Sequence, residues 1–173
     1  MYRQVIASRL FILVLLLAVL GPTSSCALFG LGGGGDDVKH NRNYSVSAPA
    51  AWKKIDSDDS DQAYRLPSGN IVEMTSSCNR DTREPLEWMT RHLLIGDRGT
   101  NIVQREKLVV DGKEGMFSEV ETTLEGKPFR LNLFVLPSHG CIFDFSLVSP
   151  RNISQNETHE FLSFVKSFKY GKN

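Results

Sequence analysis

The feature that most constrains the fold is residues 101–150, where four β-rich runs follow one another with only short turns between them. The turns fall at residues 111–112, 125–126 and 137–140, and each of them contains a Gly. Because turns this short join antiparallel neighbours, the runs predict a four-stranded β-meander. Its large apolar side chains are expected in the core: Phe117, Phe129, Leu131, Leu133, Val135, Ile142, Phe143 and Phe145.

Two segments outside the meander have a helical period instead. Residues 85–96 place Leu86 and Leu94 on one apolar stripe and end at a Gly, which predicts a helix of about eleven residues. Near the C-terminus, Ser154 and Glu157 have the spacing of a capping box and precede an apolar stripe. A second helix is therefore expected at the end of the chain.

The remaining ordered segments favour further strands. Residues 44–55 alternate apolar and polar positions before and after a Pro, and residues 62–78 form two runs joined by a Pro-Ser-Gly-Asn turn. The chain is thus predicted to be an α+β protein. Its antiparallel sheet of about six to seven strands carries an internal helix and a C-terminal helix packed on it.

The order of these elements resembles the PsbP-like domains, a family named for an accessory protein of photosystem II. The resemblance covers residues 44–170, from an opening strand that ends in "SAPAAWKK" to the final helix "FLSFVKSFKY". It implies an α/β/α sandwich and a role as an accessory, assembly or partner-binding module. It also implies that there are no shared catalytic residues to carry over, and bacterial members of the family include exported lipoproteins.

The N-terminus has the three parts of a signal peptide. Arg3 and Arg9 precede an unbroken apolar run at residues 10–20, and small polar residues follow it. A helix of that run would cover only about 16 Å, roughly half the hydrocarbon thickness of a bilayer. Export is therefore favoured over a helix that spans the membrane.

Cys26 ends the signal in a way that resembles the lipobox of bacterial lipoproteins. Ser24 and Ser25 fit the two positions before the cysteine, whereas Thr23 stands where leucine is usual. Cys26 is therefore expected to carry lipid, palmitate included, and to anchor the chain to a membrane. Ordinary signal-peptidase cleavage after Ala27 is the alternative.

Three cysteines in an exported chain leave one of them unpaired. Lipidation of Cys26 leaves Cys78 and Cys141 as a candidate disulfide. Two free buried thiols remain an alternative, as does a nucleophile built from Cys141 with His139. The second alternative lacks an evident group that would orient the histidine.

The sequence divides into a signal peptide at residues 1–25, a Gly-rich flexible tether at 26–43, a single domain at 44–170 and a tail at 171–173. The chain holds 20 basic and 20 acidic residues, and removal of the signal takes away two arginines and no acid. The remaining 18 basic and 20 acidic residues give a net charge near −2, which argues against a nucleic-acid partner.

No motif for catalysis, a cofactor or a metal is present. The four histidines are scattered without ligand spacing, so no catalytic residue, cofactor or metal ligand is expected. Candidate partner-binding residues are Trp52 and Trp88, with core packing favoured for Trp88, and the polar connection that holds Asp97 and Arg98.

The predicted function is a non-enzymatic lipoprotein anchored through Cys26 and facing the periplasm. It would be an accessory, assembly or partner-binding module of the envelope, with an unidentified protein partner. Ala27 at the second mature position favours the outer over the inner membrane. The alternative is a small periplasmic hydrolase with a site near Cys141, His139 and Asp144, although alternation along the strand turns Asp144 away from Cys141.

Overall fold

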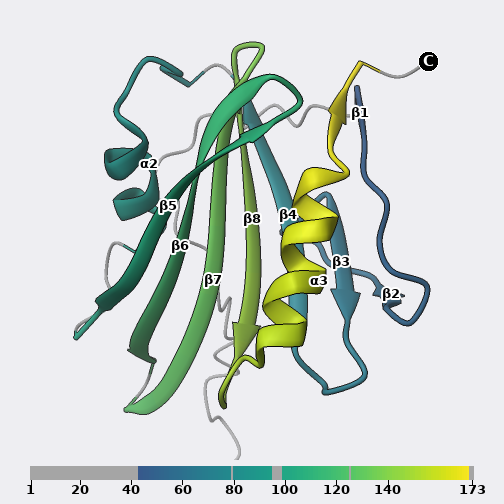
Figure 1. Cartoon of the computed structure of the whole chain (residues 1–173), viewed down its shortest axis with the longest axis vertical. Helices are drawn as coiled ribbons and strands as arrows, with labels where there is room; N and C mark the ends of the chain where they lie inside the picture. Colours follow the sequence, from purple (N-terminus) through teal and green to yellow (C-terminus); the bar gives the residue numbers. More distant parts are fainter. Residues whose placement is uncertain (1–42, 79, 95–98, 125, 172–173) are drawn as a thin grey trace, which may run out of the picture. The chain divides into compact units, whose positions relative to one another are not determined.

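The computed structural model describes residues 43–78, 80–94, 99–124 and 126–171. Its main feature is a seven-stranded antiparallel sheet with the strand order β2-β3-β4-β8-β7-β6-β5 (Figure 1). The strands of this sheet are β2 (Lys53–Ile55), β3 (Gln62–Arg65), β4 (Ile71–Cys78), β5 (Asn101–Val110), β6 (Lys113–Leu124), β7 (Lys127–Ser138) and β8 (Cys141–Ser149).

The predicted meander is confirmed as β5 to β8, in which each strand pairs with the next one along the chain. The tight turns carry backbone in the left-handed region, at Asp111 and Gly112 between β5 and β6 and at His139 and Gly140 between β7 and β8. Gly adopts this conformation without steric cost, which explains its place in these turns. The hairpin expected around residues 67–70 joins β3 to β4.

One pairing in the sheet joins segments that are distant in sequence. Strand β4 lies antiparallel to β8 along its whole length, in a register from Ile71 opposite Val148 to Cys78 opposite Cys141. This pairing attaches the β2-β3-β4 part of the sheet to the meander. The Cys78–Cys141 disulfide closes the last pair of the register, where the two Cα atoms are 4.0 Å apart. The disulfide predicted from the cysteine count is therefore present.

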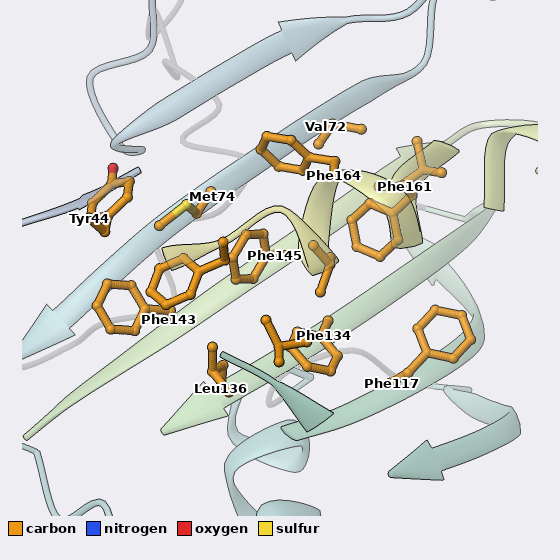
Figure 2. Close-up of a cluster of buried hydrophobic side chains, with 14 of the residues drawn as sticks. Tyr44, Val72, Met74, Phe117, Phe134, Leu136, Phe143, Phe145, Phe161 and Phe164 are labelled. Carbon is orange, nitrogen blue, oxygen red and sulfur yellow. The ribbon is translucent and has the colours of Figure 1, made fainter. Parts of the chain in front are cut away.

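Helix α3 (Gln155–Lys166) covers one face of the sheet. Ser154 and Glu157 form the predicted capping box, in which each side chain bonds the backbone N–H of the other residue. The helix buries Phe161, Phe164 and Val165 against apolar side chains of β4, β7 and β8 (Figure 2). Phenylalanine dominates this core, and its fully buried large side chains include Phe117, Phe134, Phe143, Phe145, Phe161, Phe164 and Phe168.

Helix α2 (Leu86–His92) lies on the opposite face of the sheet (Figure 1). Met89 packs against Val135 and Ile142, and Leu94 packs against residues of β6 and β7. The helix is shorter than the eleven residues expected. It ends in a tightened turn, in which the N–H of Leu94 donates to the carbonyl of Arg91 rather than to a residue four positions back.

A separate two-stranded sheet joins the two ends of the described domain. Strand β1 (Tyr44–Ser45) pairs with β9 (Lys169–Tyr170), and Tyr44 packs its ring against Phe143 and Phe168 in the main core. This pairing was not predicted. With one helix on each face of the main sheet, the domain is an α+β protein with the α/β/α layering that the resemblance implies.

Candidate functional site

The three residues of the hydrolase alternative are not brought together. Cys141 is bonded to Cys78 and lies on the α3 face of the sheet with Phe143 and Phe145. Asp144 lies on the α2 face, because successive side chains of a strand point to opposite faces. The Cys141 sulfur that would attack a substrate is bonded to Cys78, and the sheet lies between it and the carboxylate of Asp144. The structure therefore forms no hydrolase site from these residues.

His139 takes part in a contact of another kind. Its ring stacks on Tyr170, with the ring centroids 3.8 Å apart, and its Nδ1 lies 2.7 Å from the Ser138 hydroxyl. Beside it, Asp111 accepts hydrogen bonds from the backbone N–H of Tyr170 at 2.9 Å and from the Lys169 ammonium at 3.2 Å. The hydrogen bond from the Tyr170 backbone N–H is the main cause that holds the pKa of Asp111 below its usual value. These contacts fasten strand β9 to two turns of the meander.

The two tryptophans have opposite environments. Trp52 is only 6% exposed, packs on Phe164 and donates its indole N–H to Glu160 at 3.0 Å. Trp88 is 59% exposed, and its ring lies tilted against that of His92 one turn further along α2, with the ring centroids 5.5 Å apart. Core packing, which the sequence favoured for Trp88, is therefore not what the structure has. Of the two candidate anchors, only Trp88 has an exposed ring.

Trp88 is one of a small set of exposed apolar side chains. Among the described residues, the exposed large hydrophobic side chains are Trp88, Val103 and Val109, and we call these three the hydrophobic edge. Val103 and Val109 lie on β5, the last strand of the main sheet, with Val103 at an irregularity of its pairing. The sequence did not single out either valine, since an isolated valine in a strand normally signals burial.

Strand β5, which carries two residues of the hydrophobic edge, also carries charged residues. Lys107 forms an ion pair of 2.9 Å with Glu114 on β6. The hydrogen bond and charge of Glu114 raise the pKa of Lys107, and Glu87 on α2 adds to this effect. Helix α2 packs on β6 and β7, and the charge of its Glu87 still reaches Lys107 on the edge strand β5. Charged residues in the middle of β5 are typical of sheet edges that resist pairing with further strands.

A second surface lies on the other half of the α2 face. Asp144 stands opposite Thr75 in the β4-β8 pair, and Glu73 lies two residues before Thr75 on the same face. The hydroxyl of Thr75 is 3.5 Å from the backbone carbonyl of Asp59, in the loop between β2 and β3. We call Asp59, Glu73 and Asp144 the acidic face. None of the three takes part in an ion pair among the described residues.

The carboxyl groups of the acidic face have unusual proton affinities. Burial raises the pKa of Asp144 from 3.8 to about 7, and the positive charge of Arg80 offsets this only in part. Its Oδ1 atom is buried and has no hydrogen-bond partner in the described part of the chain. Burial and the negative charge of Asp59 raise the pKa of Glu73, against a hydrogen bond from Ser57. Both carboxylates are thus short of stabilising contacts.

In the part of the chain that the structure describes, neither surface contains a set of side chains that could bind a metal ion. Within residues 43–78, 80–94, 99–124 and 126–171, no group of three or more His, Cys, Asp or Glu side chains is arranged to hold an ion. Over the same residues, no helix combines the length and apolar character needed to cross a bilayer. Three predicted site residues, Cys26, Asp97 and Arg98, lie outside the described residues.

Comparison with known proteins identifies the class of fold. No protein-family model matches the sequence, and no curated protein matches it either. The domain nevertheless has the PsbP-like fold, because it is similar to the solution structure of cyanobacterial PsbP (CyanoP) from Synechocystis sp. PCC 6803. The TM-score is 0.54 at 16% identity, and the match covers 87% of this chain and 99% of CyanoP.

A second similar structure is that of LpqN, described as involved in cell envelope biogenesis of Mycobacterium tuberculosis. The TM-score is 0.52 at 13% identity, over 80% of this chain and 87% of LpqN. Both likenesses concern the fold, which is the one that the opening strand and final helix predicted.

Proposed function

We propose that the chain is a non-enzymatic accessory protein of a bacterial cell envelope. Its signal at residues 1–25 directs export, and cleavage before Cys26 leaves a lipid on that residue. The tether at residues 26–43 joins the lipid to a partner-binding domain at 44–170 that faces the periplasm. The outer membrane is the favoured site, since Ala27 follows the lipidated residue.

The observation that carries the partner-binding role is the hydrophobic edge. A tryptophan that is 59% exposed loses the favourable burial that such a large ring usually gains, and two exposed valines lie on the edge strand β5. Tryptophan is among the residues enriched at the energetic centres of protein interfaces. We therefore assign the hydrophobic edge to an envelope protein that covers Trp88 when it binds.

The fold supports an accessory role rather than catalysis. LpqN, which has the same fold, is described as involved in cell envelope biogenesis, and the family resemblance implies assembly and partner binding. Fold likeness alone does not define a function. The proposal therefore also relies on the exposed Trp88 and on the disulfide that occupies Cys141.

The anchor is tested with a matched pair of variants in the full chain. Cys26→Ser removes the lipid acceptor and should move the protein from the membrane to the soluble fraction. Thr23→Leu restores the usual lipobox residue and should keep the protein on the membrane. Incorporation of an alkyne-labelled fatty acid should be lost only in Cys26→Ser. Continued membrane association of Cys26→Ser would refute the lipid anchor.

The partner-binding role is tested by cross-linking in cells that express the full chain. A photoreactive amino acid at Val109 should join the domain to one envelope protein, and Trp88→Ala should reduce that product. Glu84→Ala, an exposed residue just before α2, serves as the matched control. If Trp88→Ala and Glu84→Ala give the same yield of product, the hydrophobic edge is not the partner site.

A further inference from the structure

The half of the α2 face formed by β4 lies outside the clusters that α2 and Leu94 make with the sheet, whereas Val148 near the end of β8 packs against the cluster of Leu94, Leu131 and Leu133. Helix α2 packs over β6, β7 and the first residues of β8, and α3 lies on the opposite face. The side chains on this half of the face, and those of β8 beside it, are half-buried. They are Ile71, Glu73, Thr75 and Ser77 on β4, and Asp144, Ser146 and Val148 on β8.

The chemistry of these side chains is a mixture of carboxylates, hydroxyls and a short apolar strip. Ile71 and Val148 stand opposite each other at one end of the β4-β8 pair. The next pair on the same face is Glu73 with Ser146, and the one after it is Thr75 with Asp144. An apolar strip therefore leads directly to two carboxylates. Asp59 adds a third negative charge from the loop beside Thr75.

The carboxylates of this surface form no ion pair among the described residues. Arg80 is the cation that acts on Asp144, yet it forms no ion pair with it in the described residues. The buried Oδ1 of Asp144 also lacks a hydrogen-bond donor. A buried acceptor without a donor is costly, and a buried carboxylate without a cation is costlier still. A cation that arrives beside Glu73 and Asp144 would offset the charge of both carboxylates.

We propose that the acidic face binds a basic segment of a protein partner, with lysine or arginine side chains that reach Glu73 and Asp144. The aliphatic stem of such a side chain matches the strip of Ile71 and Val148, and its charged end matches the two carboxylates. The hydroxyls of Thr75 and Ser146 can bond to the backbone of the segment. This inference rests on the proposed partner-binding function and adds a second contact surface to the hydrophobic edge.

The test is a binding measurement on the purified full chain in a non-ionic detergent. The probe is a fluorescein-labelled peptide of twelve residues with alternating Lys and Ser, and a Glu-Ser peptide of the same length is the control probe. Fluorescence anisotropy at low salt and pH 8, where the Asp144 carboxyl group is ionised, should detect binding of the Lys-Ser peptide only. The double variant Glu73→Gln/Asp144→Asn should raise its dissociation constant by about tenfold.

Glu119→Gln is the matched control variant. Glu119 is also a half-buried strand glutamate, but alternation along β6 places it on the α3 face with Phe117. Its substitution should leave the dissociation constant unchanged. Both carboxyl-to-amide changes preserve shape, and a urea unfolding curve of each variant establishes that it is folded. Equal weakening by Glu119→Gln would mean general attraction to an acidic protein and would overturn the proposal.

A photoreactive version of the probe locates the binding site. Cross-links should fall on residues 56–61, 71–78 and 141–149, and cross-links confined to residues 86–110 would overturn the proposal. The chain's own Lys39 and Arg42 are the other cations to consider. If Lys39→Ser/Arg42→Ser increased the affinity for the probe tenfold, the chain itself would be the occupant and the proposal would be wrong. None of these readouts depends on Cys26 or Trp88, so this inference and the proposed function can fail separately.

Discussion

The indole N–H of Trp52 donates a 3.0 Å hydrogen bond to Oε2 of Glu160, which joins the chain just before β2 to the middle of α3. Trp52→Phe removes the donor and leaves the carboxylate of Glu160 with one bond fewer. We expect this change to lower the free energy of unfolding by about 1–3 kcal/mol. Trp88→Phe, on the exposed ring, should change it by less than about 0.5 kcal/mol. Urea unfolding at pH 7 measures both, and equal effects would contradict the contrast in burial.

Asp144 should make the domain less stable as the pH rises. Its pKa is raised from 3.8 to about 7 in the folded state, so the folded protein holds this proton more tightly than the unfolded chain. The stabilisation is complete below pH 4 and is lost as the pH rises to about 7. Asp144→Asn should therefore stabilise the protein on the order of 2–4 kcal/mol at pH 8 and much less at pH 4.

Asp111 should affect the pH dependence of stability in the opposite direction to Asp144, and it serves as an internal control. Its pKa is lowered in the folded state, chiefly by the hydrogen bond from Tyr170 N–H, so its contribution is present at neutral pH and is lost in acid. Asp111→Asn should destabilise the protein at pH 7, and the difference should shrink as the pH falls below 4. Unfolding curves at pH 3, 4, 6 and 8 test both residues. A pH profile that Asp144→Asn leaves unaltered would refute the assignment to that residue.

The Cys78–Cys141 disulfide should contribute much of the stability of the domain. Its cysteines are 63 residues apart in sequence, and the chain-entropy model gives about 4 kcal/mol for a loop of that size. Cys78→Ala/Cys141→Ala should lower the urea midpoint, and a reducing agent should then have no further effect. Cys26→Ser should leave the midpoint unchanged, because Cys26 lies outside the domain. A midpoint that the double variant shares with the oxidised parent would show that the bond does not matter for stability.

Gly115 should not tolerate a side chain. A Cβ atom at this position would lie 2.7 Å from the carbonyl oxygen of Val135 and would also overlap the ring of Phe134. Because backbone on β7 cannot withdraw without disturbing the sheet, Gly115→Ala should cost about 1–3 kcal/mol or more. Glu114→Ala, at the exposed neighbouring position, is the control and removes only a surface ion pair. Thermal unfolding distinguishes them, and similar midpoints would refute the close approach of β6 and β7.

Local signals in the sequence predicted much of the fold. The capping box of Ser154 and Glu157 defined the start of α3, and the short turns defined the meander of β5 to β8. Such features depend on residues within a few positions of one another. The pairing of β4 with β8 and of β1 with β9 depends on residues 63 to 126 positions apart, and no local pattern encodes it.

The candidate surfaces were harder to predict for the same reason. Alternation along β8 correctly placed Asp144 on the face opposite Cys141, but the missing donor at its Oδ1 depends on every element nearby. Trp88 lies close to the apolar stripe of its helix, and only the short length of α2 and its position on the sheet decide its exposure. The cysteine pairing could be predicted because a count of three leaves few arrangements.

The pairing of β1 with β9 leaves Asn43 and Gly171 one hydrogen bond apart, with the N–H of Gly171 donating to the carbonyl of Asn43 at 2.9 Å. A circularly permuted domain could therefore be made by joining these two ends through a few glycines and opening the chain at an exposed turn elsewhere. The domain could also be inserted as one unit into a loop of another protein, because it would enter and leave that host at nearly the same point.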